Sequence, residues 1–315
     1  MRLSQENKEF IRQSVLEQGF ECCGFAVAGP VSAEASKRYD DWIAAGKQST
    51  MAYLEKYRDI KNDPRLLLEG AKTVIAVAVN YLPKNFQAPE APQFAYYAYG
   101  KDYHEVIRDR LRPVAQLMHE KFGCENRICV DTAPLRERYW AQQAGIGFVG
   151  RNNQIIIPNK GSYFLLGFII TTAEIEPDEP CTLNCLGCRR CIIYCPSGAL
   201  KEEGACDARL CHSCLSIEYR GELDEKVRFG RQIYGCDICL RVCPHNHNAQ
   251  PTEIEEFQPS EEFMALRRED IEQMSTEDYN RIFRHSAIKR AKLAQLKRNM
   301  EHMDKPCPPV VKSSD

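Results

Sequence analysis

The sequence predicts a mixed chain, of the α+β or α/β class, with three successive parts. Residues 1–175 are predicted to form an α/β domain, residues 176–250 a cysteine-rich module and residues 251–315 a helical tail. Up to about residue 175, apolar β-branched runs alternate with segments of helical periodicity. Most of the 16 cysteines then fall within 176–250, and helical patterns follow from 260 to 303.

The first domain opens with a helix over 4–18, whose apolar residues lie on one stripe. A short strand is predicted at 24–28, and a second helix at 33–45 ends at Gly46. The run 73–81 is apolar and β-branched, which predicts a buried central strand.

The second half of this domain continues the alternation. A helix over 103–122 is stopped by Gly123, a strand covers 127–131, and a helix over 135–144 is closed by Gly145. The segments 154–157 and 163–171 are predicted as paired strands joined by a turn at 158–161. No Gly-x-Gly-x-x-Gly pattern follows a strand, so a Rossmann nucleotide site is not indicated.

The most informative stretch is a run of four cysteines: Cys185, Cys188, Cys191 and Cys195, followed by Pro196. This C-x2-C-x2-C-x3-C-P spacing is typical of bacterial ferredoxins. Three of its thiolates hold one [4Fe–4S] cluster, and the fourth reaches a different cluster. The run therefore predicts a second group of cysteines, and with it a protein that moves electrons one at a time through two clusters.

The second group is Cys236, Cys239 and Cys243, followed by Pro244. Two clusters need eight ligands and the two runs supply seven, so one ligand must come from elsewhere. The candidates are Cys206, Cys211 and Cys214, with Cys181 as an outside option. Because the last cysteine of each run binds the cluster of the other run, one set is predicted to be Cys185, Cys188, Cys191 and Cys243. The other set is predicted to be Cys195, Cys236, Cys239 and the additional cysteine.

Two other uses of cysteine were considered. A disulfide framework usually belongs to short secreted chains, whereas this N-terminus is polar and no long apolar stretch could span a membrane. Zinc could occupy paired C-x2-C motifs, but the continuous run ending in Pro favours iron–sulfur clusters. We therefore expect a cytoplasmic protein with no membrane segment. Simple packing is expected for Cys22, Cys23, Cys124, Cys129 and Cys307.

Asp131 is the candidate for chemistry outside the clusters. It follows a predicted strand, at the edge of the sheet where α/β proteins bind ligands. An Asp before a helix is more often an N-cap, and spacing alone favours that role.

The charge is nearly balanced, with a net value of −2, which excludes a polycationic chain. However, residues 281–298 contain seven Lys or Arg and no acid. Such a segment is either a solvated face or an electrostatic footprint for phosphates.

Several ordered segments carry a resemblance. They are Asp63-Pro-Arg-Leu-Leu-Leu, Gly100-Lys-Asp-Tyr-His104, Asp131-Thr-Ala-Pro-Leu-Arg-Glu-Arg138, Ala144-Gly-Ile-Gly-Phe, Gly150-Arg-Asn and Pro158-Asn-Lys-Gly-Ser-Tyr-Phe. Over nearly the whole chain they resemble the epoxyqueuosine reductases, cobalamin-dependent iron–sulfur enzymes of tRNA modification. The segment Cys211-His-Ser-Cys-Leu-Ser-Ile-Glu218 is similar to the family segment that donates the eighth cluster ligand. The resemblance therefore selects Cys211 as that ligand.

The resemblance implies a reaction. Base-off cobalamin would lie in the α/β domain beside one [4Fe–4S] cluster, and the second cluster would accept electrons from a flavodoxin or ferredoxin type of donor. Two electrons and two protons would convert epoxyqueuosine, at the wobble position of tRNA, to queuosine with loss of water. Asp131 would give a proton to the departing oxygen, and a desolvated pocket would raise its pKa.

The resemblance also implies cofactor contacts at Lys61, Tyr97, Asn152, Ile155 and Ser162. Lys101 and His104 lie in a segment that approaches the corrin in relatives. Core packing is the alternative for Tyr97 and its neighbour Tyr99. The chain is expected to be a monomer.

Two departures from the family pattern stand out. No Cys occurs within 94–97, where some relatives carry one, and the chain ends about where C-terminal helical repeats begin in many relatives. We therefore expect a basic helix at 288–298 to take a larger part in gripping tRNA. The alternatives were a corrinoid reductase of a small molecule, similar to reductive dehalogenases, and an electron carrier of ferredoxin type.

Overall fold

The centre of the molecule is a four-stranded sheet. The computed structural model describes residues 2–185, 187–202 and 205–303. The strands are β1 (Cys22–Val27), β2 (Thr73–Asn80), β4 (Asn126–Cys129) and β7 (Phe164–Thr171), in the order β1-β2-β7-β4. Every neighbouring pair is antiparallel, which makes the first domain α+β.

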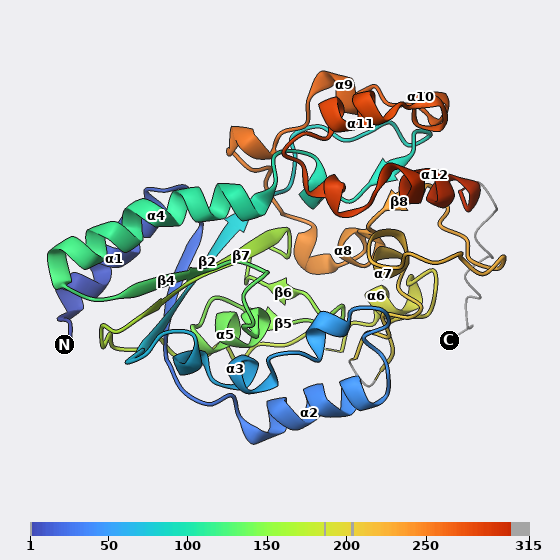
Figure 1. Cartoon of the computed structure of the whole chain (residues 1–315). Coiled ribbons are helices and arrows are strands. Elements are labelled where there is room, and N and C mark those ends of the chain that lie inside the picture. Colours follow the sequence, from blue (N-terminus) through green and yellow to red (C-terminus); the bar gives the residue numbers. More distant parts are fainter. Residues whose placement is uncertain (1, 186, 203–204, 304–315) are drawn as a thin grey trace.

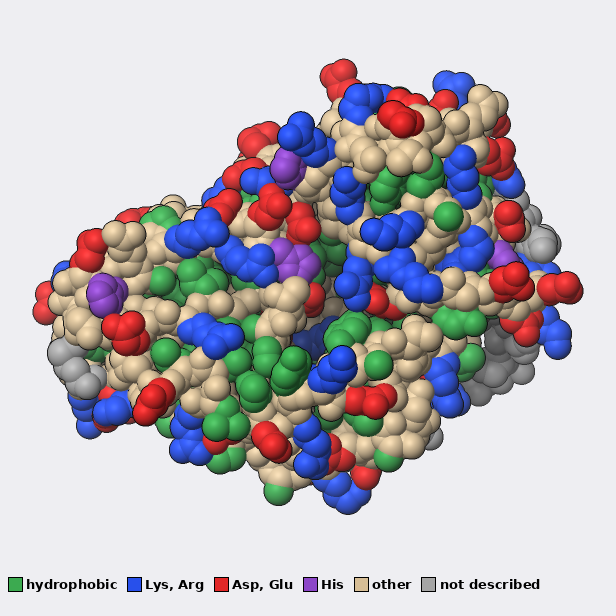
Figure 2. All heavy atoms as spheres, in the orientation of Figure 1, with side chains coloured by type: hydrophobic (Ala, Val, Ile, Leu, Met, Phe, Trp, Pro, Cys, Tyr) green, Lys and Arg blue, Asp and Glu red, His purple; other side chains and the backbone are tan. Residues whose placement is uncertain are grey.

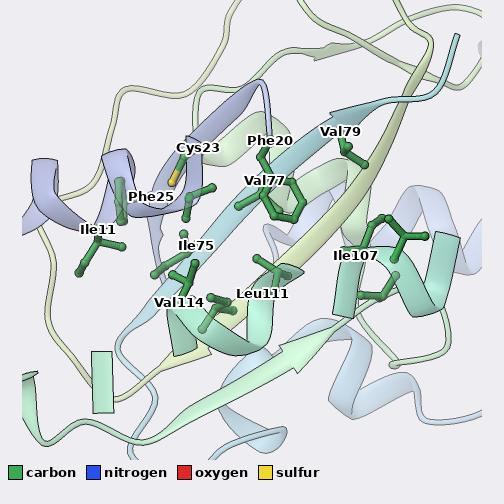
Figure 3. Packing of buried hydrophobic residues seen from close by; sticks show 14 of the residues in the cluster. Ile11, Phe20, Cys23, Phe25, Ile75, Val77, Val79, Ile107, Leu111 and Val114 are labelled. Atoms are coloured by element: carbon green, nitrogen blue, oxygen red, sulfur yellow. The ribbon is translucent and has the colours of Figure 1, made fainter. Parts of the chain in front are cut away.

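Helices cover both faces of this sheet (Figure 1). On one face, α1 (Gln5–Leu16) and α4 (Tyr103–Phe122) bury the larger core cluster, in which Ile11, Leu111 and Val114 meet Phe25 and Ile75 (Figure 3). On the other face lies α5 (Glu137–Gln143), packed through Trp140 and Ala141. Because the sheet is covered on both sides, all residues of β2 are buried, as the apolar run at 73–81 predicts.

Local signals set the helix ends. Asp102 caps α4 by accepting the N–H of His104, and Gly123 closes the helix at φ 61°, a left-handed conformation that glycine adopts without strain. Ser4 caps α1 and Ser32 caps α2 (Ala33–Ala44) in the same way as Asp102. The expected bounds of these helices therefore hold to within one or two residues.

The predicted hairpin of 154–157 with 163–171 is wrong. Strand β6 (Ile155–Ile156) pairs with β5 (Phe148–Val149), and only one isolated bridge, Ile157 to Gly161, spans the turn. Strand β7 instead enters the main sheet between β2 and β4. In that position it gains eight register partners on β2 alone, which a short hairpin could not supply.

The cysteine-rich module contains the short helices α6 (Arg190–Ile193), α7 (His212–Ile217) and α8 (Ile238–Arg241) and strand β8 (Gln232–Tyr234). Strand β8 pairs in parallel with β3 (Gln93–Phe94), which lies far earlier in the chain. The module is therefore tied to the first domain by main-chain hydrogen bonds as well as by side chains.

The tail is a series of short helices: α9 (Glu261–Met264), α10 (Arg268–Gln273), α11 (Thr276–Ile282) and α12 (Leu293–Glu301). These helices share one core with residues around β3 and β8, including Phe94, Tyr99 and Tyr234. The single basic helix expected at 288–298 is wrong, because η6 (Ala287–Arg290) is a 3-10 turn and α12 begins only at Leu293. Among the described helices, none is both long and apolar enough to cross a membrane.

Helix α12 is fixed to the cysteine-rich module by side-chain amides. Asn299 is fully buried, and its Nδ2 donates to the carbonyls of Ser216 at 2.9 Å and Ile233 at 2.8 Å. Gln295 Nε2 donates to the carbonyls of Ser216, Ile217 and Tyr219 at 2.9–3.1 Å. The carbonyls of Ser216 and Ile217 lie in the last turn of α7, and that of Ile233 lies in β8, so α12 completes the hydrogen bonding of both elements.

Asn299→Leu keeps the side-chain size but removes both donors. Because the carbonyl of Ile233 would stay buried without this partner, and that of Ser216 would keep only Gln295, we expect the free energy of unfolding to fall by about 1–3 kcal/mol. Urea denaturation measures this. The matched control is Lys297→Gln, on the same helix, with an expected change within about 0.5 kcal/mol. Equal stability of Asn299→Leu and wild type would show that α12 is not held this way.

Candidate iron–sulfur centres and active site

Four cysteines from the two runs line one pocket. They are Cys185, Cys188, Cys191 and Cys243, in the company of Arg151, Asn152 and Ile156 from the first domain. The last cysteine of the second run thus lies with the first three of the first run. The main-chain N–H of Arg151 donates to Cys185 Sγ at 3.4 Å, so the first domain contacts this inner set directly.

The second group is Cys195, Cys211, Cys236 and Cys239. Burial raises the pKa of Cys236 to about 12, and neighbouring Cys211 and Cys195 add to this. The pKa of Cys239 is raised by burial first and then by Cys236, Cys211 and Cys195. Cys236 and Cys239 therefore lie near both Cys195 and Cys211, which brings members of the two runs together with a cysteine from between them.

The structure separates the three candidates for the odd ligand. Hydrogen bonds from the Cys206 thiol and from the main-chain N–H groups of Ser213 and Cys214 favour the thiolate of Cys211, and the pKa of Cys211 is lowered. Cys206 is the protonated donor of that pair. The pKa of Cys214 is raised by burial to about 12, and its thiol meets Ser49 instead. The thiolate is the ligand form, and Cys211 stays the predicted eighth ligand.

The described cysteines outside this module are free thiols of the first domain. Cys23, Cys124 and Cys129 are buried in the core, and burial raises the pKa of Cys129 to about 11. This agrees with the packing role expected for them. Cys307 lies outside the described residues.

Asp131 lies on the loop after β4 and does not cap a helix. Helix α5 begins at Glu137, with Arg136 as its N-cap, so the cap alternative is wrong. Asp131 has φ 50°, in the left-handed region that non-glycine residues rarely adopt. Its main-chain N–H donates to Glu137 Oε1 at 2.6 Å, and this contact holds the loop. Its side chain remains 56% exposed.

A histidine lies against this carboxylate. His104 Nε2 is 3.1 Å from Asp131 Oδ2, and His104 Nδ1 is 2.7 Å from Asp102 Oδ1. The rings of Tyr103 and His104 stack at 4.1 Å. Burial alone would lower the pKa of His104, but its hydrogen bonds to the two carboxylates outweigh burial and raise it to about 9. The imidazole is therefore positively charged at neutral pH.

The expectation of a raised pKa for Asp131 is wrong. Burial acts to raise it, but the hydrogen bonds from His104 and Tyr103 and the charge of His104 prevail, and the pKa is lowered. The acid that retains its proton is Glu137, whose pKa is raised to about 8 by burial and by the charge of Asp131. Nothing in the sequence alone indicates this role of Glu137, although the residue stands six positions after Asp131 in the same motif.

Lys61 and Tyr97 have partners within the protein. Lys61 is buried, and its Nζ donates to the carbonyls of Tyr53 at 3.0 Å and Leu54 at 2.6 Å. The Tyr97 hydroxyl donates to that of Tyr234 at 3.3 Å, in the core that the tail shares. Both side chains therefore have structural roles, and core packing accounts for Tyr97.

Asn152, Ile155 and Ser162 approach the cysteine-rich module or the sheet. Asn152 is buried, and its Nδ2 has no hydrogen-bond partner within the described part of the chain. Ile155 is buried in the core beneath α5. The N–H of Ser162 donates to Asn246 Oδ1 at 2.7 Å, which joins the turn after β6 to the residues that follow Cys243.

The basic residues of the tail are less available than the sequence indicates. Arg290 forms a bidentate pair with Glu218, at 3.0 and 2.8 Å, and Arg298 donates to main-chain carbonyls of the cysteine-rich module. Lys289, Lys292 and Lys297 form no ion pair with any described residue. Figure 2 shows Lys and Arg side chains gathered on the tail side of a central hollow.

The chain resembles known proteins over most of its length. Residues 61–132 match the family model of epoxyqueuosine reductase QueG, DUF1730, and residues 184–246 match that of the 4Fe-4S double cluster binding domain. The epoxyqueuosine reductase of Cellulophaga algicola is 31% identical over 306 residues, which cover 96% of this chain and 100% of the relative. That of Synechococcus sp. strain RCC307 is 35% identical, covering 95% and 94%. The chain belongs to the epoxyqueuosine reductase family.

Solved structures of this family share the fold. An epoxyqueuosine reductase crystallised with an epoxyqueuosine-modified tRNA-Tyr stem loop is 29% identical, with a TM-score of 0.84 over 94% of this chain and 80% of that one. The Bacillus subtilis enzyme, in a structure whose catalytic aspartate loop is swung out of the active site, is 28% identical, with a TM-score of 0.85 and the same coverage. This chain is accordingly an oxidoreductase with a double iron–sulfur cluster domain.

Proposed function

We propose that this chain reduces epoxyqueuosine to queuosine at the wobble position of tRNA, with cobalamin as its cofactor and two [4Fe–4S] clusters as its electron path. The observation that carries the proposal is the pair of crossed cysteine sets beside an α+β domain in which Asp131 is exposed and hydrogen-bonded to His104. The tRNA stem loop bound by a relative of the same fold supports the substrate.

The inner cluster would be held by Cys185, Cys188, Cys191 and Cys243, and the outer one by Cys195, Cys211, Cys236 and Cys239. The inner set lies against Arg151 and Asn152 of the first domain, which supports its place as the cluster nearer the cofactor. The outer cluster would be the entry point for single electrons from an external low-potential donor of flavodoxin or ferredoxin type. The main-chain N–H of Arg151, which donates to Cys185 Sγ, would stabilise the reduced inner cluster.

The residues present fit cobalamin at one point. The corrin ring carries amide side chains, and the buried, unpartnered Nδ2 of Asn152 is a donor that an amide oxygen would satisfy. Ile155 would offer an apolar side chain to the corrin, and Ser162 a main chain fixed by Asn246. Lys61 and Tyr97 would act indirectly, by fixing the neighbouring chain segments that their side chains contact. Cobalamin, when bound, supplies a low-valent cobalt able to deliver electrons to a carbon–oxygen bond.

The protein's own contribution is to the departing oxygen. Opening the epoxide leaves an alkoxide, which is a poor leaving group unless an acid neutralises it. Asp131 is the exposed acid of the site, and the Glu137 contact fixes its loop. We therefore assign to Asp131 the transfer of a proton to that oxygen.

The direct test is anaerobic conversion. The protein, with reconstituted clusters, is incubated with cobalamin, a low-potential reductant and tRNA that carries epoxyqueuosine. The tRNA is then digested, and the masses of its nucleosides are measured by mass spectrometry. Wild type should produce a nucleoside lighter by one oxygen, and Asp131→Asn should lose about 10²–10⁴-fold in rate because the acid is gone. Asp109→Asn, an exposed acid on α4, is the control. Full conversion by Asp131→Asn would remove Asp131 from the mechanism.

The odd cluster ligand is tested by iron content. Cys211→Ala should lose about half of the bound iron, since one of two clusters loses a ligand. Cys206→Ala and Cys214→Ala are matched controls from the same segment and should keep both clusters. Iron analysis and absorption spectra after anaerobic reconstitution measure this. If Cys211→Ala kept all of its iron, Cys211 would not be the ligand. If Cys206→Ala lost iron instead, Cys206 would be the ligand.

The tail's part in binding tRNA is tested on lysines without ion-pair partners. Reversing Lys289, Lys292 and Lys297 to Glu should weaken tRNA binding and reduce the slope of log affinity against log salt, because fewer counterions are released. Filter binding across a salt series measures both quantities. Reversal to Lys of Glu6 and Glu9 on α1 and of its C-cap Glu17 is the control, because it changes the net charge by the same amount in the opposite direction, far from the tail in sequence. If the triple reversal left both the affinity and the salt slope unchanged, the tail would have no part in binding tRNA.

A further inference from the structure

The proton needed at Asp131 is not on Asp131. The carboxylate accepts hydrogen bonds from His104 and Tyr103, which favour its ionised form, and the neutral acid nearby, Glu137, points its Oε1 at a main-chain N–H. An acid that is ionised before the reaction cannot protonate a leaving oxygen unless another group supplies it. The hydrogen bond between His104 Nε2 and Asp131 Oδ2, 3.1 Å long, identifies that group.

We propose that Asp102, His104 and Asp131 form a proton relay, in which His104 supplies to Asp131 the proton that reaches the substrate oxygen. This inference rests on the proposed function. Asp102 Oδ1, at 2.7 Å from Nδ1, orients the ring so that Nε2 faces Asp131, and Asp102 is itself fixed as the N-cap of α4. His104 does not contact the substrate in this proposal, and its effect on the reaction passes through Asp131.

The step balances with the electrons of the reaction already proposed. Both carbon–oxygen bonds of the epoxide break, a carbon–carbon double bond forms, and two electrons enter from the low-potential donor through the clusters. The oxygen takes one proton from Asp131 Oδ2 and a second from solvent, and leaves as water. Because Asp131 begins ionised, Nε2 of His104 passes its proton to Asp131 as Asp131 passes one to the oxygen. Asp131 ends ionised, as it began, and His104 becomes a neutral imidazole until solvent restores its proton.

The charges around the His104–Asp131 pair come from α4, from α5 and from η6, where Arg290 interacts with Asp131. Helix α4 contributes Asp102, Tyr103 and Arg108, and Arg108 donates to Thr132 Oγ1 at 3.1 Å on the Asp131 loop. From α5, Glu137 and Arg138 act on Asp131.

Two carboxylates contact the ring directly, so the imidazolium is favoured, and the pKa of about 9 follows from this geometry. Because the folded-state pKa is raised, the proton is held fully below about pH 7 and is lost as pH rises through 9. Ionisation of Glu137 near pH 8 adds a negative charge and keeps the imidazolium in place longer.

The first readout needs no turnover. In the protein with oxidised clusters, the seven histidines are titrated by NMR, and the signal missing in His104→Gln is assigned to His104. Its midpoint should lie near pH 9 in wild type and move down by about one unit or more, toward the ordinary value of about 6.5, in Asp131→Asn and Asp102→Asn. A wild-type midpoint near 6.5, or no shift in either variant, would overturn the relay.

The second readout is the pH profile of single-turnover conversion. Wild type should hold its rate up to about pH 9, whereas His104→Gln should lose rate from below neutral pH upward, since Asp131 must then keep its own proton. The loss at pH 8 should be on the order of 10²-fold or more, with tRNA affinity unchanged. His119→Gln, in the last turn of the same helix, should keep the wild-type profile.

The outcomes separate the two proposals. If wild type converts the tRNA and His104→Gln shows the wild-type profile, the relay is wrong and the reductase stands. If loaded wild type converts nothing, the proposed function is wrong and the relay falls with it. Iron content and circular dichroism of each variant exclude loss of fold as the cause.

Discussion

The return of Cys243 to the first cysteine run is the constraint on which the rest of the structure depends. For Cys243 to lie with Cys185, Cys188 and Cys191, the chain between the runs must fold back on itself. That return places β8 beside β3 in a parallel pair and puts Asn246 against Ser162. The cysteine-rich module is thereby joined to the first domain at two points, and the inner set lies against Asn152.

The tail completes this arrangement. A module built around clusters has short helices and few apolar residues, so the ends of its elements leave main-chain groups without partners. Gln295, Arg298 and Asn299 of α12 donate to carbonyls around α7 and β8. The basic composition of this segment therefore serves folding in part, which divides its positive charges into those committed to the protein and those free to meet a phosphate.

Local signals in the sequence predicted what depends on local physics. Helix α4 has the expected bounds because Asp102 and Gly123 fix its ends, and the cysteine spacing identified both runs. The hairpin prediction failed because the partners of β7 lie on β2 and β4, and pairing over such separations leaves no mark in the segment itself. The role of Arg298 was invisible because its acceptors are main-chain carbonyls. The sign of the pKa shift of Asp131 required His104, which lies 27 positions earlier in the chain.

The backbone at Asp131 explains why two acids are needed where one performs the chemistry. A left-handed φ at a residue other than glycine is strained and persists only when neighbouring contacts fix it. Glu137 supplies that contact by accepting the N–H of Asp131, and its burial keeps it neutral near pH 7. Glu137 thus adds no charge to those of Asp131 and Asp102 near pH 7. The loop can hold Asp131 against His104 and still leave its side chain exposed, because the carboxyl that anchors the loop is that of Glu137 and not that of Asp131.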